Sequence, residues 1–385
     1  MEKEKFNGNR LKTARLYRAK TLAELAEDID VSKQAISQYE NAEVTPEYSK
    51  LFNIMQALDF PRDYFYQTDN VEIETTATYF RSLLRTHKKD RLAQIKKSEY
   101  VGLLYDFLSE YIRFPKLNIP KFDIPIIDNE IIYDNLAIEL RNYWGLNDLP
   151  IQDLVYELER NGIILTSFNS TSNDIDAYSQ RLKTNNGGKY LIVLASNKES
   201  KARRHFDCAH ELGHIILHNW NEDLETISKS EFTSIETQAN KFAASFLLPK
   251  EPFSKDVLKH PISLEYYKEL KLKWNVSIGA MLMRAKDIGL INPNQYQNLI
   301  RKYSSRGWRN KEPLDDILLI PNPSLLKSAT KKVLEGKKWD GETFARMFSQ
   351  KYNICLNKNE LELLLNLEKG FLSTNDKKVL ELKLL

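Results

Sequence analysis

The feature that most constrains this chain is a His-Glu-x-x-His pattern at residues 210–214, within a stretch that carries three of the chain's 6 histidines. On a helix, His210 and His214 lie one turn apart on the same face, which is the spacing that two imidazoles need to bind one tetrahedral Zn²⁺. Glu211 lies one residue further round, where its carboxylate could take a proton from a water molecule at the metal. The apolar residues 215–217 predict that this helix belongs to a core. The pattern therefore predicts a metal-dependent hydrolase, although a helix with two surface histidines would look the same.

A catalytic zinc site needs a third protein ligand. His218 lies eight residues beyond His210, roughly 12 Å along a straight helix, and is too distant to share the ion. We expect it either to hydrogen-bond a ligand or the substrate, or to be a helix-end histidine that faces the C-terminal dipole. Glu236 is the better candidate, because it precedes small residues on one side of a predicted helix at 234–248 that would permit close packing. A first-turn glutamate favoured by the helix dipole is the alternative.

These two motifs together resemble the ImmA/IrrE family of metallopeptidases. The resemblance rests on residues 210–218 and on Glu236-x-x-Ala-Asn-x-Phe-Ala-Ala, with weaker support from the segments before them, and it covers about residues 125–295. It implies a zincin-like core in which His210, His214 and Glu236 bind Zn²⁺ and Glu211 is the catalytic base. It also implies a protein substrate, often a helix-turn-helix repressor whose cleavage turns on stress or mobile-element genes.

Other residues near the motif could stabilise the oxyanion of a hydrolysis reaction. The candidates are Tyr178, Arg204 and His218. Residues 162–168 and 189–195 read as short strands, and residues 174–182 as a third. They predict a small antiparallel sheet beside the metal helix. An exposed edge of that sheet could align an extended peptide, or the sheet could simply cover one helix.

The N-terminal 67 residues carry a separate signal. Thr21 and Glu24 form a capping box that opens a short helix, and Ser32 can cap the helix that follows. Two short helices joined by a tight turn predict a helix-turn-helix, whose second helix would enter the major groove of double-stranded DNA. The outward-facing residues expected to contact DNA are Lys33, Gln34, Ser37 and Gln38, and Arg15, on the first helix of the region, is expected to contact the DNA backbone.

This N-terminal region resembles the XRE, or phage-repressor-like, DNA-binding domain over residues 9–67. It departs from that family at Leu22, where glutamine is frequent, and at Ala42, where glycine is common. The alternative is a helix-turn-helix that makes only protein contacts.

The composition of the chain limits its domain organisation, its DNA-binding surface and its expected location. A chain of 385 residues is expected to form several domains, and a net charge of +3 means that any DNA-binding footprint is local. Cys208 and Cys355 are too few for a disulfide framework. No signal peptide and no apolar run of membrane-spanning length is evident, so we expect a cytoplasmic protein without a membrane partner.

The expected fold class is α+β and mostly helical. It comprises a five-helix helix-turn-helix domain at 6–67, a helical connector at 68–125, a metallopeptidase domain at 126–295 and a helical region of unassigned role at 296–385. The expected function is a DNA-binding regulator, monomeric or homodimeric, fused to a zinc endopeptidase. The alternatives are a non-proteolytic regulator whose metal domain is structural or senses a small molecule, and an antitoxin-like interaction protein. Glu211 favours catalysis, because a structural zinc site needs no base.

Overall fold

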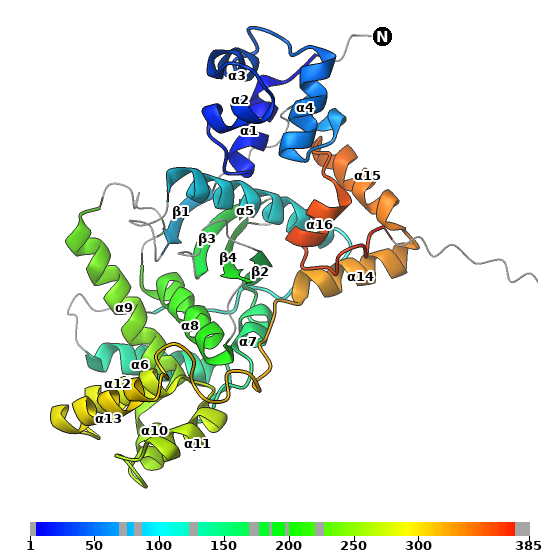
Figure 1. Cartoon of the computed structure of the whole chain (residues 1–385). Helices are drawn as coiled ribbons and strands as arrows, with labels where there is room; N and C mark the ends of the chain where they lie inside the picture. The colour runs from blue at the N-terminus through cyan, green and yellow to red at the C-terminus, as the bar shows by residue number, and fades with distance from the viewer. Residues whose placement is uncertain are drawn as a thin grey trace, which may run out of the picture.

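The computed structural model describes residues 5–68, 75–80, 87–122, 130–168, 177–184, 187–196, 200–218, 220 and 227–373. Helices surround one small sheet, which confirms the expected α+β, mostly helical class (Figure 1). None of the helices in these ranges combines the length and the apolar character of a membrane span.

Five short helices form the N-terminal unit: α1 Gly8–Tyr17, α2 Leu22–Asp28, α3 Lys33–Glu40, α4 Tyr48–Leu58 and the 3₁₀ helix η1 Arg62–Phe65. The predicted caps are present. Thr21 and Glu24 form the capping box of α2, and the Ser32 side chain accepts a hydrogen bond from the Ala35 amide at the start of α3. Both caps satisfy backbone amides that a helix start leaves without partners, so they fix where the two helices begin.

The sheet has four strands in the order β1-β3-β4-β2, namely β1 Thr75–Phe80, β2 Ile164–Phe168, β3 Ala177–Thr184 and β4 Gly187–Ala195. The prediction of a purely antiparallel sheet is wrong, because β2 pairs with β4 in parallel. Strands β2, β3 and β4 alternate in direction along the chain, but β4 lies between β3 and β2 in the sheet. It therefore pairs antiparallel with β3 and parallel with β2. β1 extends the sheet from a segment predicted to be helical, and the same connector also contains the long helix α5 Lys88–Ser109.

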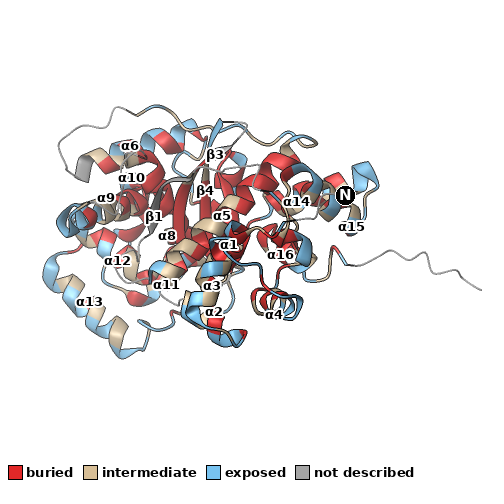
Figure 2. Ribbon diagram, turned by 90° about the horizontal axis from the view of Figure 1, so that it is seen from above, coloured by how far each residue is buried: buried red, intermediate tan, exposed pale blue. Residues whose placement is uncertain are grey.

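Strand β4 is buried on both faces over residues 191–195. Leu191 and Val193 of β4 face a core that includes α5 and the N-terminal helices, whereas Ile192 and Leu194 face a second core that includes α8. This alternation is the two-residue period of a strand, and it explains the nearly continuous apolar run in β4. The sheet therefore separates two hydrophobic cores, and Figure 2 shows the buried residues concentrated on the strands, α5 and α8.

The second core is completed by helices on the far side of the sheet from α5. They are α6 Glu130–Tyr143, α7 Leu154–Arg160, α8 Lys201–Leu217, α9 Lys229–Leu247, α10 Lys250–Val257, α11 Leu264–Trp274, α12 Ile278–Asp287 and α13 Pro293–Ser305. The central helix is α8, which packs against α9 and against β3 and β4.

The C-terminal helices α14 Leu325–Lys337, α15 Gly341–Tyr352 and α16 Lys358–Leu364 return to the first core beside α5. They also cover the outer edge of β2, where Thr166 donates to the Leu364 carbonyl and the Ser167 amide donates to Asn366. An extended peptide therefore cannot add at this edge, and strand addition at the β1 edge stays a prediction.

Candidate metal centre

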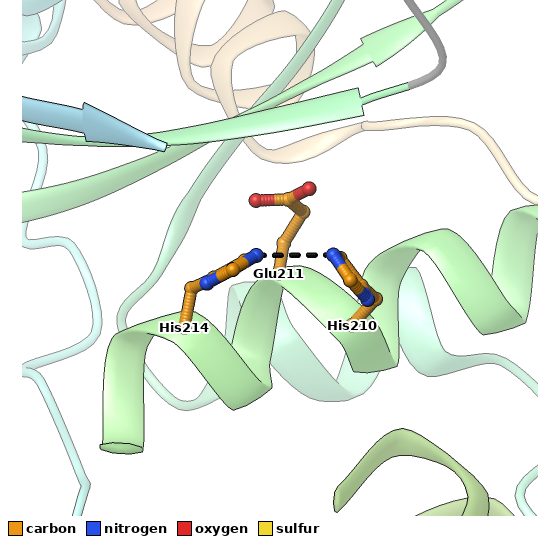
Figure 3. A group of neighbouring side chains, drawn as sticks. All are labelled: His210, Glu211 and His214. Carbon is orange, nitrogen blue, oxygen red and sulfur yellow. Dashed lines mark hydrogen bonds between the residues drawn. The ribbon is translucent and has the colours of Figure 1, made fainter. Parts of the chain in front are cut away.

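Helix α8 places three chemically active side chains together in the interior. His210, Glu211 and His214 are each no more than 1% exposed, and one ligand atom from each lies within 4.8 Å of the others. The Nε2 atoms of the two histidines are 3.0 Å apart. Figure 3 shows the two rings on neighbouring turns of α8, with the Glu211 carboxylate between them and directed toward the sheet. The group could therefore hold a metal ion.

Helix α9 brings a further carboxylate to the same point. The Glu236 oxygens lie 3.4 Å from His210 Nε2 and 3.3 Å from His214 Nε2. α9 begins at Lys229, behind a capping box formed by Ser228 and Glu231, rather than at residue 234. Glu236 therefore lies about two turns into the helix, which removes the explanation that it is a first-turn residue favoured by the dipole.

Small residues allow the two helices to cross closely enough for this contact. A Cβ atom added at Gly213 would lie 3.1 Å from both the Cα and the carbonyl oxygen of Ala239. Ala239 is fully buried and lies one turn beyond Glu236. A larger side chain at either position would push α9 away and carry the Glu236 carboxylate with it.

The distances fit a tetrahedral metal. Bonds of about 2.0–2.1 Å to nitrogen and oxygen place neighbouring ligand atoms of a tetrahedron roughly 3.3 Å apart. The two histidine nitrogens and the Glu236 carboxylate form a triangle of ligand groups: the Nε2 atoms are 3.0 Å apart, His210 Nε2 lies 3.4 Å from Glu236 Oε2, and His214 Nε2 lies 3.3 Å from Glu236 Oε1. Two imidazoles and one carboxylate, with one position left over, are a donor set suited to Zn²⁺. Glu211 is held apart from this triangle, because its Oε2 accepts a 2.6 Å hydrogen bond from Ser179 on β3.

The outer nitrogens of the two histidines also have partners. His210 Nδ1 lies 3.0 Å from Asn240 Oδ1, and His214 Nδ1 lies 3.0 Å from His218 Nδ1. His218 Nε2 in turn lies 3.0 Å from Gln238 Oε1. If the Asn and Gln oxygens accept, each outer nitrogen of His210 and His214 carries a proton and each Nε2 keeps its lone pair for a metal. This agrees with the expectation that His218 hydrogen-bonds a ligand rather than binding the ion.

Burial shifts the pKa values of two ionisable groups in the site, Glu211 and His214. It raises the pKa of Glu211 to about 7, although nearby His210 and the hydrogen bond from Ser179 oppose the shift. It lowers the pKa of His214 to about 3, so that imidazole is neutral at pH 7, as a metal ligand must be. A carboxylate with a pKa near neutrality can both accept and return a proton, which is what general acid–base chemistry requires.

Comparison with known families agrees with this geometry. The model of the IrrE N-terminal-like domain matches residues 159–286, which include α8 and α9. A helix-turn-helix model matches residues 11–65. The chain carries an IrrE-like domain behind a helix-turn-helix domain.

Searches against individual proteins add little to this assignment. A solved structure of a Mycobacterium tuberculosis transcriptional regulator is 17% identical and aligns over 52% of this chain with a TM-score of 0.30. The alignment spans 54% of that regulator, about half its length. No curated protein matches the chain.

Two of the three predicted oxyanion residues lie away from the metal centre of the IrrE-like domain. Tyr178 is on the face of β3 opposite to α8, where its hydroxyl lies 3.1 Å from Ser98 Oγ and donates to the Gln94 carbonyl on α5. Arg204 donates to the Ala195 carbonyl at the end of β4. Both predictions are wrong for a physical reason: each side chain is buried and bonded to a structural partner. His218 alone remains beside the site.

The helix-turn-helix domain presents α3 to solvent. Lys33, Gln34 and Gln38 are exposed on this helix, and Ser37 is half-buried. Arg15 is not a surface residue. It is buried in a bidentate ion pair with Glu40, at 2.5 and 2.9 Å, so the prediction that it contacts the DNA backbone is wrong.

Sequence reasoning missed the residues that support the site. Ser179 lies in the segment before the histidine motif, and only the strand register shows that it faces Glu211. Asn240 and Gln238 follow Glu236 at four and two residues, and no periodic pattern marks a hydrogen bond to a histidine ring. Gly213 is a small residue within the histidine motif, but no sequence signal shows that it lies opposite Ala239 of α9.

Proposed function

We propose that this protein is a DNA-binding transcriptional regulator whose IrrE-like domain is a zinc endopeptidase, with a helix-turn-helix repressor as its substrate. The observation that carries this proposal is the triangle of His210, His214 and Glu236 donor atoms beside the buried carboxylate of Glu211. A purely structural metal site has no need of a base with a pKa near 7, whereas peptide hydrolysis does.

In this proposal each residue has a defined task. His210, His214 and Glu236 would hold Zn²⁺, which supplies a Lewis acid that polarises a peptide carbonyl and makes water more acidic. Glu211 takes a proton from the attacking water and returns it to the leaving amine. Ser179 orients Glu211 through its hydrogen bond, and Asn240 and His218 keep the histidine lone pairs directed inward.

The test compares wild type with Glu211→Gln, measuring bound zinc and cleavage of a helix-turn-helix repressor co-expressed from the same locus. We expect both proteins to bind one zinc ion, while the variant loses cleavage by roughly 10²- to 10⁴-fold. His214→Gln serves as the control that loses the metal. Equal cleavage by wild type and Glu211→Gln would rule out the assigned base.

The DNA-binding part of the proposal rests on α3. Lys33, Gln34, Ser37 and Gln38 would face the major groove of double-stranded DNA, and such a role places the protein in the cytoplasm. Gln34→Ala combined with Ser37→Ala should abolish the specific gel shift of the gene's own promoter. An unchanged shift would refute this assignment. A two-fold symmetric operator would indicate that the protein binds as a homodimer.

A further inference from the structure

The face of α8 that carries the metal-site histidines also lines part of a cavity nearer the start of the helix. Residues at positions 203, 207, 210 and 214 follow one another at intervals of four, three and four, so they share one face of the helix. His210 and His214 form the metal-site end of this face. Arg203 and Asp207 form the other end and line a cavity of about 390 Å³. The cavity thus lies along the same face of α8 as the candidate metal site, one to two turns nearer the start of the helix.

The far side of this cavity is built by a different part of the chain. Ser277 and Ala280 come from α12, Tyr303 from the end of α13, and Trp308 from the loop that follows. That loop passes beside α8 in Figure 1, and Ser200 at the start of α8 donates a 2.8 Å hydrogen bond to Asp315. The cavity volume is at the lower end of the range of small-ligand pockets, roughly 300–1,000 Å³, and suits one large side chain with part of its backbone.

Two wall carboxylates are already fully engaged. Both oxygens of Glu312 accept hydrogen bonds, from the Ile278 and Gly279 amides, Tyr303 and Lys271. Asp315 accepts from Lys271, from Ser200 and from the Glu312 amide. These groups complete the fold around the buried Lys271 and are not available to bind a ligand cation.

Aromatic side chains form part of the cavity wall. Phe206, Tyr303 and Trp308 line it, and the last two rings meet edge to face with centroids 6.0 Å apart. The exposed Arg203 and Arg309 would repel a basic side chain. A neutral aromatic ring is the side chain that this lining accommodates best, because such rings pair favourably in edge-to-face and offset arrangements.

The distance to the metal centre matches a peptide. The Phe206 and His210 rings are stacked with centroids 6.5 Å apart. An extended chain rises about 3.3 Å per residue, so a ring lodged near Phe206 would belong to a residue about two positions from the bond held at His210.

We propose that this cavity is a specificity subsite that takes an aromatic side chain of the substrate, about two residues from the scissile bond. The inference rests on the proposed peptidase function. It names a structural determinant of substrate choice that lies outside the metal site, on α12, α13 and the loop after them.

The decisive variant fills the cavity from α12. Ala280→Phe adds a ring to the wall, and Met283→Phe adds the same ring on the exposed side of the same helix as the matched control. Zinc-loaded full-length proteins are given a peptide library in which phenylalanine or alanine occupies one position at a time. We expect wild type and Met283→Phe to prefer phenylalanine at one position by at least roughly 10-fold in kcat/KM, and Ala280→Phe to lose that preference while still cleaving the alanine peptides.

A second variant and a second readout separate this inference from the peptidase proposal. Trp308→Ala removes a ring from the opposite wall and should also reduce the preference, whether or not Ala280→Phe folds. Binding of N-acetyl-phenylalanine amide and N-acetyl-alanine amide to the Glu211→Gln protein is followed by ligand-observed NMR, which needs no turnover. If no peptide is cleaved, the peptidase proposal fails, and stronger binding of the phenylalanine amide that Ala280→Phe abolishes would still support the aromatic subsite. Equal preference in all variants, or no binding of the phenylalanine amide, would overturn it.

Discussion

At the scale of single residues, the candidate site depends on side chains that would not touch a metal. An imidazole binds a metal through one nitrogen only if the proton is kept on the other, and a hydrogen-bond acceptor at that second nitrogen fixes both the tautomer and the ring orientation. Asn240 fulfils this task for His210, and His218 fulfils it for His214 with Gln238 behind it. Asn240 and Gln238 come from α9 and His218 from the C-terminal end of α8, so the site depends on how these two helices cross.

Replacing Asn240 with leucine should weaken zinc binding by roughly 10- to 100-fold, because the His210 Nδ1 proton loses its acceptor while the ligand set is unchanged. The measurement is a competition titration with a zinc chelator. Thr237→Leu, at an exposed position on the same helix, is the control and should bind zinc as wild type does. An affinity equal to that of the control would show that His210 needs no such partner.

His205 provides a pH-dependent prediction that does not involve the metal. Burial lowers the pKa of this imidazole to about 3, its Nε2 accepts from the Leu154 amide, and its buried Nδ1 has no hydrogen-bond partner among the described residues. An unfolded chain takes up this proton near pH 6.5, whereas the folded chain does so only near pH 3. Between pH 6.5 and pH 3 the unfolded state therefore binds more protons than the folded state. As the pH is lowered through this range, the free energy of unfolding decreases by up to about 1.4 kcal/mol per pH unit.

The comparison protein is His205→Gln, which lacks this titration. Urea unfolding at pH 7, 6 and 5 should show a steeper loss of stability in wild type than in the variant, whatever their difference at pH 7. Parallel losses in the two proteins would mean that His205 is protonated in the folded state.

At the scale of elements, the crossing of α8 and α9 decides whether Glu236 reaches the histidines. The sequence was sufficient to predict the histidine pair, because a helical period alone places them on one face. It also indicated the small residues of α9. It could not show that Gly213 lies opposite Ala239, because the register between two helices depends on packing rather than on either helix alone. For the same reason the prediction of a purely antiparallel sheet was wrong: the strand sequences do not reveal that β4 lies between β3 and β2 and pairs with β2 in parallel.

Gly213→Ala should therefore destabilise the protein by about 1–3 kcal/mol and weaken zinc binding, because the new methyl group meets the Ala239 backbone and displaces α9. Gly336→Ala is the matched control. It lies in α14 with no atom within 4 Å of the new Cβ, and it should stabilise the protein slightly, by up to about 1 kcal/mol. Thermal unfolding and zinc titration of both variants test this. Equal stability of the two variants would show that the helices separate without cost.

At the scale of the whole molecule, the N-terminal and C-terminal regions pack as neighbours. Gln67, just after η1, donates to Ser349 on α15 and accepts from the Cys355 amide, and Asn357 donates to Asp59. The same C-terminal region covers the edge of β2. The domain boundaries at 67, 125 and 295 stay predictions. Helices α14–α16 share one hydrophobic core with the N-terminal helices and α5, so removal of residues 325–373 would expose apolar surface on the N-terminal helices and on α5.

Glu360 of α16 links the C-terminal helices to the N-terminal helices through polar contacts. It is 5% exposed, it accepts a hydrogen bond from the buried Tyr17 hydroxyl, and it pairs with Arg18 at 2.7 Å. Glu360→Gln removes the charged acceptor of both Tyr17 and Arg18, but Arg18 is 21% exposed and keeps its hydrogen bonds to the Leu58 and Asp59 carbonyls. We therefore expect a cost of about 1.5–3 kcal/mol, the range for hydrogen bonds to charged groups. The matched control is Glu342→Gln, which breaks an exposed 2.7 Å pair with Lys358 and should cost at most about 1 kcal/mol. Chemical unfolding gives both values, and limited proteolysis should show earlier cleavage between the N-terminal helices and α5 only in Glu360→Gln. Equal destabilisation by the two substitutions would mean that the N-terminal helices are held by the apolar core alone.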